Sequence, residues 1–159
     1  MTELEPCNEL ELDQQLCFAL YAASRAVTAR YRPMLEAIGL TYPQYLVMML
    51  LWEEDHQTVG QLGSRLALDS GTLSPLLKRL EARALVERRR SQVDERVVEV
   101  FLTPEGRALE QRALELFPRL VCKTELSFGE LAQLRDTLRK LTRTLHAAPP
   151  DAPGDTPEE

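Results

Sequence analysis

The stretch LVERRRSQVDERVVEVFLTP, residues 85–104, changes the periodicity of the chain from helical to alternating. Alternation of apolar and polar residues is typical of half-buried strands. We therefore predict two strands, at residues 85–89 and 97–102, joined by a polar loop at residues 91–96. This hairpin decides the fold, because the apolar patterns on both sides of it have helical spacing.

Apolar residues recur at three- and four-residue steps before and after the hairpin, which predicts helices on both sides. The first helix is expected to run from residue 12 to the Gly39 region, with a bend at Pro33. Helix-capping sequences mark where the others begin. Their expected starts are Thr41, Thr58, Asp69 or Ser70, Thr103 and Ser127. The predicted order is four helices, a hairpin and two helices.

Two short helices joined by a tight turn and followed by a two-stranded hairpin are typical of a winged helix-turn-helix. We therefore expect a mainly α fold with a small β-hairpin, in which N- and C-terminal dimerisation helices flank a winged helix-turn-helix domain. The domain would cover residues 12–146, with dimerisation helices at 12–39 and 104–146 and a DNA-binding module at 58–102. The alternative, a compact all-α bundle with an incidental hairpin, does not explain why basic residues concentrate in the module.

The net charge of −6 argues at first sight against nucleic-acid binding. The acidic residues are, however, concentrated at the ends: residues 1–13 and 147–159 hold nine of them and no lysine or arginine. The segment between the ends has 16 acidic and 19 basic residues, a net charge of +3. We interpret residues 1–11 as an acidic arm and residues 147–159 as a disordered, proline-rich acidic tail.

Cysteine and histidine usage, together with hydropathy, excludes several classes of protein. Three cysteines, an odd number, do not fit a secreted disulfide framework. The N-terminal residues show no signal-peptide pattern, and the most apolar run, residues 45–52, is too short to cross a bilayer. A cytoplasmic location without membrane contact is expected. The two histidines, His56 and His146, lie in no cluster, so no metal site, cofactor or catalytic centre is predicted.

The helix expected to begin near Asp69 has the residues that a recognition helix needs. Short polar side chains at its exposed N-terminal end would let it enter the major groove, and basic residues behind them would meet phosphates. The hairpin adds arginines on both sides of its loop, and a protruding arginine suits a narrow minor groove. The predicted DNA-binding residues are Ser70, Thr72, Ser74, Lys78, Arg79, Arg88, Arg90 and Arg96.

Two motifs resemble the MarR family of transcription regulators. DERVVEVFLTPEG, residues 94–106, resembles the wing of that family, and LLKRLE, residues 76–81, resembles its recognition helix. The resemblance covers roughly residues 12–146. It implies a homodimer that binds an inverted-repeat operator in double-stranded DNA and represses transcription. It also implies that Asp94 braces the wing and that Arg96 enters the minor groove.

Cys17 lies in the first expected helix, within LCFALY at residues 16–21. A lone cysteine is most often a small buried hydrophobe, but phenols that could stabilise a thiolate by hydrogen bonding occur near it. LTYPQYLVM, residues 40–48, together with the Cys17 segment, is similar to the organic-hydroperoxide-sensing (OhrR) branch of the MarR family. The similarity implies a reactive cysteine at Cys17 and activating tyrosines at Tyr31 and Tyr42.

In a continuous helix Tyr31 would lie roughly 21 Å along the axis from Cys17, which no tyrosine side chain spans. We therefore expect Tyr31 to reach the Cys17 of a second subunit, or not to reach Cys17 at all. Cys122 matches the resolving cysteine of the two-cysteine OhrR subtype. That match implies that an organic or lipid hydroperoxide oxidises Cys17 to a sulfenic acid, and that Cys122 of the partner subunit then forms a disulfide with it. Cys7 has no counterpart in this scheme.

Three other functions stay open at this point. The protein could be a MarR-type regulator controlled by a small aromatic ligand, with cysteines that have no redox role. A thiol peroxidase would need turnover and a recycling partner, and the sequence has no Cys-x-x-Cys pair to support one. A purely structural dimer would leave the wing arginines unexplained. The sequence therefore favours a redox-sensing transcriptional repressor over an enzyme.

Overall fold

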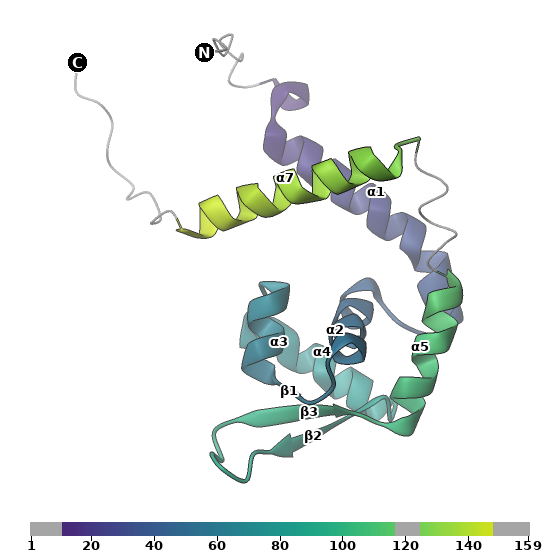
Figure 1. Ribbon diagram of the computed structural model, residues 1–159, viewed down its shortest axis with the longest axis vertical. Coiled ribbons are helices and arrows are strands. Elements are labelled where there is room, and N and C mark those ends of the chain that lie inside the picture. The colour runs from purple at the N-terminus through teal and green to yellow at the C-terminus, as the bar shows by residue number, and fades with distance from the viewer. Residues whose placement is uncertain (1–10, 117–124, 148–159) are drawn as a thin grey trace, which may run out of the picture. The chain divides into compact units, whose positions relative to one another are not determined.

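The computed structural model describes residues 11–116 and 125–147 (Figure 1). The chain divides into two compact units, Met1–Leu120 and Val121–Glu159, and each is described by itself. Most of the expected acidic arm, the expected tail beyond residue 147, Cys7 and Cys122 lie outside the described residues. The division into an arm, a domain and a tail stays a prediction.

The helices of the first unit follow the predicted order. Where residue 12 was expected to begin a long helix, Leu12–Gln14 form a separate 3₁₀ turn, because Gln15 is extended and interrupts the helical hydrogen bonding. The helix then continues through Pro33. The described helices of this unit are η1 (Leu12–Gln14), α1 (Leu16–Ala37), α2 (Tyr42–Glu53), α3 (Val59–Leu66), α4 (Ser70–Ala82) and α5 (Pro104–Leu116).

Side-chain caps fix where these helices begin, as the sequence predicts. Gln44 Oε1 accepts a hydrogen bond from the Thr41 N–H at 2.9 Å, which starts α2. Thr58 and Gln61 form a reciprocal pair at the start of α3, with distances of 2.7 and 3.1 Å. Asp69 is the N-cap of α4, since its Oδ1 accepts from the backbone N–H of Thr72 at 2.9 Å. Each cap satisfies a donor that the first helical turn would otherwise leave unpaired.

Three antiparallel strands form a small sheet in the order β1-β3-β2. The hairpin strands, β2 (Val86–Arg90) and β3 (Val98–Leu102), each begin one residue later than predicted. A third strand, β1 (Gln57–Thr58), was not predicted from the sequence; it pairs with β3. Two residues are too few to show an alternating pattern, and the helix cap at Thr58 obscures them.

The core of the first unit surrounds α2, which packs against α1, α3, α4, α5 and β3 (Figure 1). In α2, Val47, Met48 and Leu51 are fully buried. The predicted apolar stripe of α4 is buried at Leu73, Leu77 and Leu80, whereas Leu76 is partly exposed. This packing fixes one face of α4 and leaves the opposite face to solvent.

Several apolar residues in the N-terminal part of α1 are exposed, unlike the core residues of α2 and α4. Leu16, Tyr21 and Val27 are 60%, 58% and 46% exposed, and Leu35, near the other end, is the buried residue of this helix. Exposed apolar side chains of this kind fit the expectation that α1 pairs with a second copy of the chain.

The second unit is described from residue 125 to residue 147 and contains the helix α7 (Phe128–Ala147). Its start agrees with the predicted capping box, because Ser127 and Glu130 exchange hydrogen bonds between side chain and backbone at 2.8 and 3.3 Å. Leu134 and Leu145 on this helix are 48% and 65% exposed.

In the described part of the chain no single helix has the length and apolar content of a membrane span. The bent pair of α1 and α2, at 73° to one another, reaches those values only when the two are taken together.

Gly106 provides a test of the packing between α5 and the hairpin. A Cβ at this position would lie 2.0 Å from the carbonyl oxygen of Leu85, a backbone atom that cannot move aside. We expect Gly106→Ala to lower the free energy of unfolding by about 1–3 kcal/mol in urea titrations. In the matched control Gly60→Ala, the new methyl group would meet Thr58 Oγ1 at 3.9 Å, an ordinary contact. The control should be neutral or slightly stabilising, and equal losses in the two variants would contradict the packing argument.

Candidate DNA-binding surface and thiol site

The predicted recognition residues lie on the solvent side of α4. Ser70, Thr72, Lys78 and Arg79 are exposed, and Ser74 is partly exposed. The Thr72 hydroxyl donates to Asp69 Oδ2 at 2.9 Å, so it is engaged in the helix cap. The structure therefore gathers all five predicted residues on one helix.

Asp69 holds the N-terminal end of α4 in a defined conformation. Hydrogen bonds from the backbone and side chain of Thr72 hold the pKa of the Asp69 carboxyl below its ordinary value. The cap is therefore ionised at neutral pH, and its negative charge lies at the positive end of the helix dipole.

Arg88 in β2 is not free to reach a ligand as the structure stands. Its Nε and Nη2 donate to Glu81 Oε2 at 2.9 and 2.5 Å, and its backbone N–H donates to Glu81 Oε1 at 3.1 Å. These bonds, chiefly those from the Arg88 side chain, hold the pKa of the Glu81 carboxyl below its ordinary value. The pair links the end of α4 to the base of the hairpin, and the expected DNA contact of Arg88 stays a prediction.

The loop between β2 and β3 is organised around Asp94. Asp94 Oδ1 accepts from the Arg96 N–H at 3.0 Å, and the Asp94 carbonyl accepts from the Val97 N–H at 2.9 Å. The side chain of Arg96 is exposed, as is that of Arg90 at the end of β2. Asp94 thus shapes the turn that presents Arg96. Val93, which the sequence analysis did not single out, is 97% exposed at the same tip.

A stack of three side chains on the sheet, those of Arg89, Phe101 and His56, was not predicted from the sequence. The guanidinium of Arg89 lies 4.9 Å from the centroid of the Phe101 ring, and Phe101 stacks on His56 with a centroid distance of 4.4 Å. Arg89 is also paired with Glu87 at 2.7 Å. No sequence signal connects His56 with the hairpin, because β1, which lies between them, was not predicted.

The turn after α2 is fastened to the sheet by Asp55. One carboxylate oxygen of Asp55 accepts from the backbone N–H groups of His56 and Leu102, both at 2.8 Å. The other oxygen is ion-paired with Arg107 on α5. This carboxylate connects α2, β3 and α5, which positions the hairpin relative to the core.

Cys17 lies in the first turn of α1 and is exposed. Since α1 is continuous, Cys17 and Tyr31 are separated by roughly 21 Å of helix. The two residues therefore do not meet within one chain. Cys122, the predicted partner of Cys17, lies outside the described residues.

The two predicted activating tyrosines do come together. The rings of Tyr31 on α1 and Tyr42 on α2 have a centroid distance of 5.2 Å, and Tyr45 lies 6.0 Å from Tyr31. Burial, and then the neighbouring Tyr45 and Tyr42, raise the pKa of Tyr31 to about 12. Burial also raises the pKa of Tyr42. Both phenols are therefore protonated at neutral pH and can donate a hydrogen bond.

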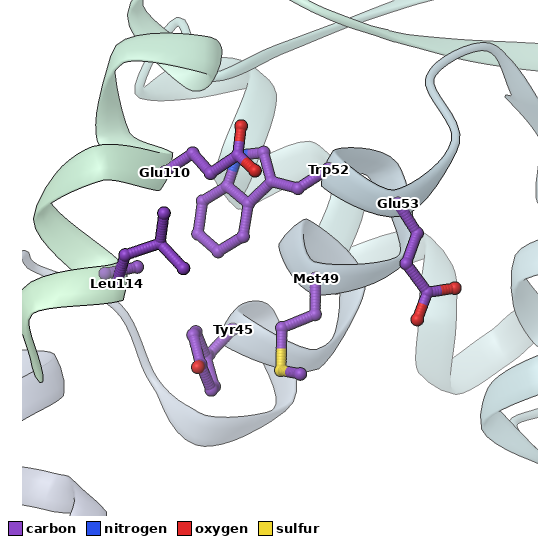
Figure 2. Close-up of a pocket in the computed structure, with 7 residues that line it drawn as sticks. Tyr45, Met49, Trp52, Glu53, Glu110 and Leu114 are labelled. Atoms are coloured by element: carbon purple, nitrogen blue, oxygen red, sulfur yellow. The ribbon is translucent and has the colours of Figure 1, made fainter. Parts of the chain in front are cut away.

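A cavity of about 290 Å³ lies between α2 and α5 beside Tyr45 (Figure 2). Figure 2 shows Trp52 and Leu114 among the residues that line the cavity, and Trp52 Nε1 donates to the Gly106 carbonyl at 2.9 Å. The walls are mostly apolar, and the lining residues are Tyr45, Met49, Trp52, Glu53, Glu110, Ala113 and Leu114. The described residues contain no group of three His, Cys, Asp or Glu side chains that could hold a metal ion.

The chain matches known regulators over most of its length. Residues 29–112 match the family model described as transcriptional regulator SarA/Rot. The organic hydroperoxide resistance transcriptional regulator of Bacillus subtilis is 44% identical over 139 residues, which is 87% of this chain and 95% of that protein. The HTH-type transcriptional regulator TtmR of Methylorubrum extorquens is 50% identical, over 86% of this chain and 70% of that protein.

Solved structures of AbfR, a protein of Staphylococcus epidermidis, are similar as well. The structure of reduced AbfR bound to DNA has a TM-score of 0.75 and 36% identity, covering 89% of this chain and 97% of AbfR. The disulfide-formed structure of AbfR has a TM-score of 0.60 and 37% identity, covering 84% and 94%. The chain belongs to the SarA/Rot and MarR-type family of winged-helix transcriptional regulators, and it is not an enzyme.

The alkaline pH dependence of stability tests the environment of Tyr31. A phenol ionises near pH 10 in the unfolded chain, while Tyr31 in the folded chain keeps its proton to about pH 12. The unfolded state therefore binds fewer protons above pH 10, and the free energy of unfolding should fall as the pH rises from about 10 to about 12. We expect Tyr31→Phe to make this fall shallower in urea titrations between pH 8 and 11. If Tyr31→Phe shows the same fall as the wild type, the buried Tyr31 phenol is excluded as the cause.

Proposed function

We propose that the protein is a redox-sensing repressor that binds DNA as a homodimer and releases it when an organic hydroperoxide oxidises Cys17. One observation carries the proposal: Cys17 is exposed on the helix that also bears Tyr31, and the paired phenols of Tyr31 and Tyr42 are too far away to act within one chain. A second subunit is then needed to complete the site. The expected cytoplasmic location is part of this proposal.

The DNA-binding role assigns α4 to the major groove and the hairpin tip to the minor groove. The exposed side of α4 carries the predicted contacts from Ser70 to Arg79, and its other face is held by three buried leucines. Arg96 stands at a tip that Asp94 keeps in a fixed turn. A two-fold dimer would present two such surfaces to an inverted repeat, with double-stranded DNA as the partner.

The sensor role pairs Cys17 of one subunit with the Tyr31–Tyr42 pair of the other. The exposed apolar residues Leu16 and Val27, which lie on the same side of α1, would be covered when α1 meets the partner. The phenols, which stay protonated at neutral pH, would donate hydrogen bonds to the thiolate and so favour its charged form. The apolar cavity beside Tyr45 would accept the hydrocarbon part of an organic or lipid hydroperoxide.

The chemistry needs two steps. The Cys17 thiolate attacks the outer oxygen of the hydroperoxide, the O–O bond breaks, and the products are a sulfenic acid and an alcohol after protonation. The thiolate of Cys122 of the partner subunit then attacks the sulfenic sulfur, the S–O bond breaks as the disulfide forms, and the hydroxide takes up a proton and leaves as water. Because the sulfurs of a disulfide are only ~2 Å apart, closing the bond between thiols that lie farther apart would shift α1, which carries Cys17. The two recognition helices would then lose the spacing that the operator requires.

A second candidate is a regulator of the same fold that responds to a small aromatic ligand. The cavity between α2 and α5 favours this candidate, because Tyr45 and Trp52 offer aromatic walls in a space of about 290 Å³. In that case the cysteines would have no redox role.

Cysteine variants separate the two candidates. We expect cumene hydroperoxide to release the wild-type protein from its operator in a mobility-shift titration, and Cys17→Ser to stay bound, because the oxidisable sulfur is absent. Cys7→Ser is the matched control and should behave as the wild type. Release of Cys17→Ser by the same peroxide dose would rule out the redox mechanism and favour the ligand-controlled alternative.

Electrophoresis without reductant tests the second step. After peroxide treatment the wild type should run as a covalent dimer, and this band should be absent in Cys122→Ser. A sulfenic-acid probe should instead label Cys17 in that variant, because no thiol is left to resolve it. A covalent dimer that persists in Cys122→Ser would show that a different cysteine is the partner.

The hairpin tip gives a test of DNA binding alone. Arg96→Ala should lower the affinity of the reduced protein for its operator by about 1–3 kcal/mol, because it removes the protruding charge from the groove. Arg89→Ala is the control, since Arg89 is paired with Glu87 and lies over Phe101. Fluorescence anisotropy with labelled duplex measures both. Equal effects would contradict the assignment of the tip to the groove.

A further inference from the structure

Two sets of hydrogen bonds satisfy the carbonyl groups at the carboxyl end of α1. The first is a Schellman turn: the N–H of Leu40 donates to the Leu35 carbonyl at 2.8 Å, and the N–H of Gly39 donates to the Glu36 carbonyl at 3.0 Å. Gly39 has a φ of 70°, which this turn requires and which glycine adopts without strain. Leu35 and Leu40 are both buried and supply the apolar contact that accompanies the motif.

This turn leaves the next three carbonyls without a helical partner. Arginine side chains from two other helices, α4 and α5, donate hydrogen bonds to these carbonyls. Arg83, the C-cap residue of α4, donates from Nη1 to the Gly39 carbonyl and from Nη2 to the Ile38 carbonyl at 3.4 Å. Arg112 on α5 donates from Nη2 to the Ala37 carbonyl at 3.0 Å. We call Arg83 and Arg112 the arginine clamp.

The clamp suits its position for two physical reasons. The carboxyl end of a helix carries partial negative charge, which favours cations there. A guanidinium is also a rigid fork of donors, so it fixes the direction of the groups it binds better than an apolar contact does. At Gly39 the fit is close, since a Cβ there would lie 2.5 Å from Arg83 Nη2.

The rest of α1 makes few restraining contacts within the first unit. Its described packing is chiefly against α2, and residues from Leu16 to Val27 are largely exposed. A helix of 22 residues is ~33 Å long, so a tilt of ~10° at its carboxyl end moves its first turn by ~6 Å. The direction of α1 relative to α4 therefore depends strongly on what holds its last turn.

We propose that the arginine clamp sets the angle between α1 and the recognition helix α4, and thereby the distance between the two DNA half-sites that a dimer accepts. The inference rests on the proposed function for the dimer and its inverted repeat, but not on the redox step. Arg83 and Arg112 are positioning residues in this scheme and do not touch DNA.

The experiment measures tolerance to half-site spacing. Duplexes that bind the reduced wild-type protein are first selected from a random pool, and the best inverted repeat is then lengthened or shortened by one base pair at its centre. Each such change moves the half-sites by ~3.4 Å and rotates one against the other. We expect the wild type to lose about tenfold or more in affinity on either change.

The variants are Arg83→Gln, Arg112→Gln and the double variant, all at exposed positions. We expect the double variant to lose less than about threefold on the same changes, because α1 can adopt more than one direction. Arg65→Gln is the control: it is an exposed arginine, but its partner is Glu53 on α2 rather than α1. It should keep the spacing preference of the wild type.

The outcomes separate the clamp from other roles of these arginines. An affinity that falls equally at every spacing, with a salt dependence reduced by about one phosphate contact, would mean that Arg83 binds DNA and would overturn the inference. A lower melting temperature with an unchanged spacing preference would show a purely structural role and would also overturn it. If the wild type selects no duplex at all, the proposed function itself fails, and the inference fails with it.

Discussion

The burial of α2 is the constraint on which the rest of the first unit depends. Val47, Met48 and Leu51 have no exposed surface, and the elements on all sides of this helix pack against it. A helix buried in this way cannot move without disturbing its neighbours, because protein interiors are close-packed and do not deform gradually. Tyr42 at one end of α2 lies against α1, and Asp55 just beyond the other end is bonded to the hairpin. The same rigid helix therefore connects the side of the molecule proposed to sense a hydroperoxide with the side proposed to bind DNA.

The sequence was sufficient for those features that local chemistry determines. The caps at Thr41, Thr58 and Asp69 were predictable because a cap and its partner lie three residues apart. The hairpin was predictable because its strands are long enough to alternate. Neither argument extends to β1, which has two residues and exists only because β3 offers it a partner. The carboxylate of Asp55 and the stack of His56 on Phe101 depend on that pairing, so they could be found only in the folded chain.

In the candidate sites, too, some features follow from the local sequence and others form only when the chain folds. Sequence reasoning placed Cys17 and Tyr31 too far apart for contact within one chain, because the rise of a helix is fixed, and α1 is continuous as that argument assumed. It could not show that Arg88 is held by Glu81, since the pair forms only when the hairpin folds back on α4. Nor could it single out Arg83 from the other arginines. Its partners lie more than forty residues earlier in the chain, and its role depends on which carbonyls the Schellman turn leaves unpaired.

Trp52, the single tryptophan of the chain, occupies a position with a practical consequence. Its indole lies in the wall of the cavity between α2 and α5, bonds to the Gly106 carbonyl and meets Tyr45 edge-on at 6.1 Å. Indole emission responds to the polarity and hydrogen bonding around the ring, and here both are set by the contact of these two helices. The molecule thus contains its own optical probe, at the junction between the paired tyrosines and the first turn of α5. A change in that junction, whatever its cause, is open to observation in solution without a label.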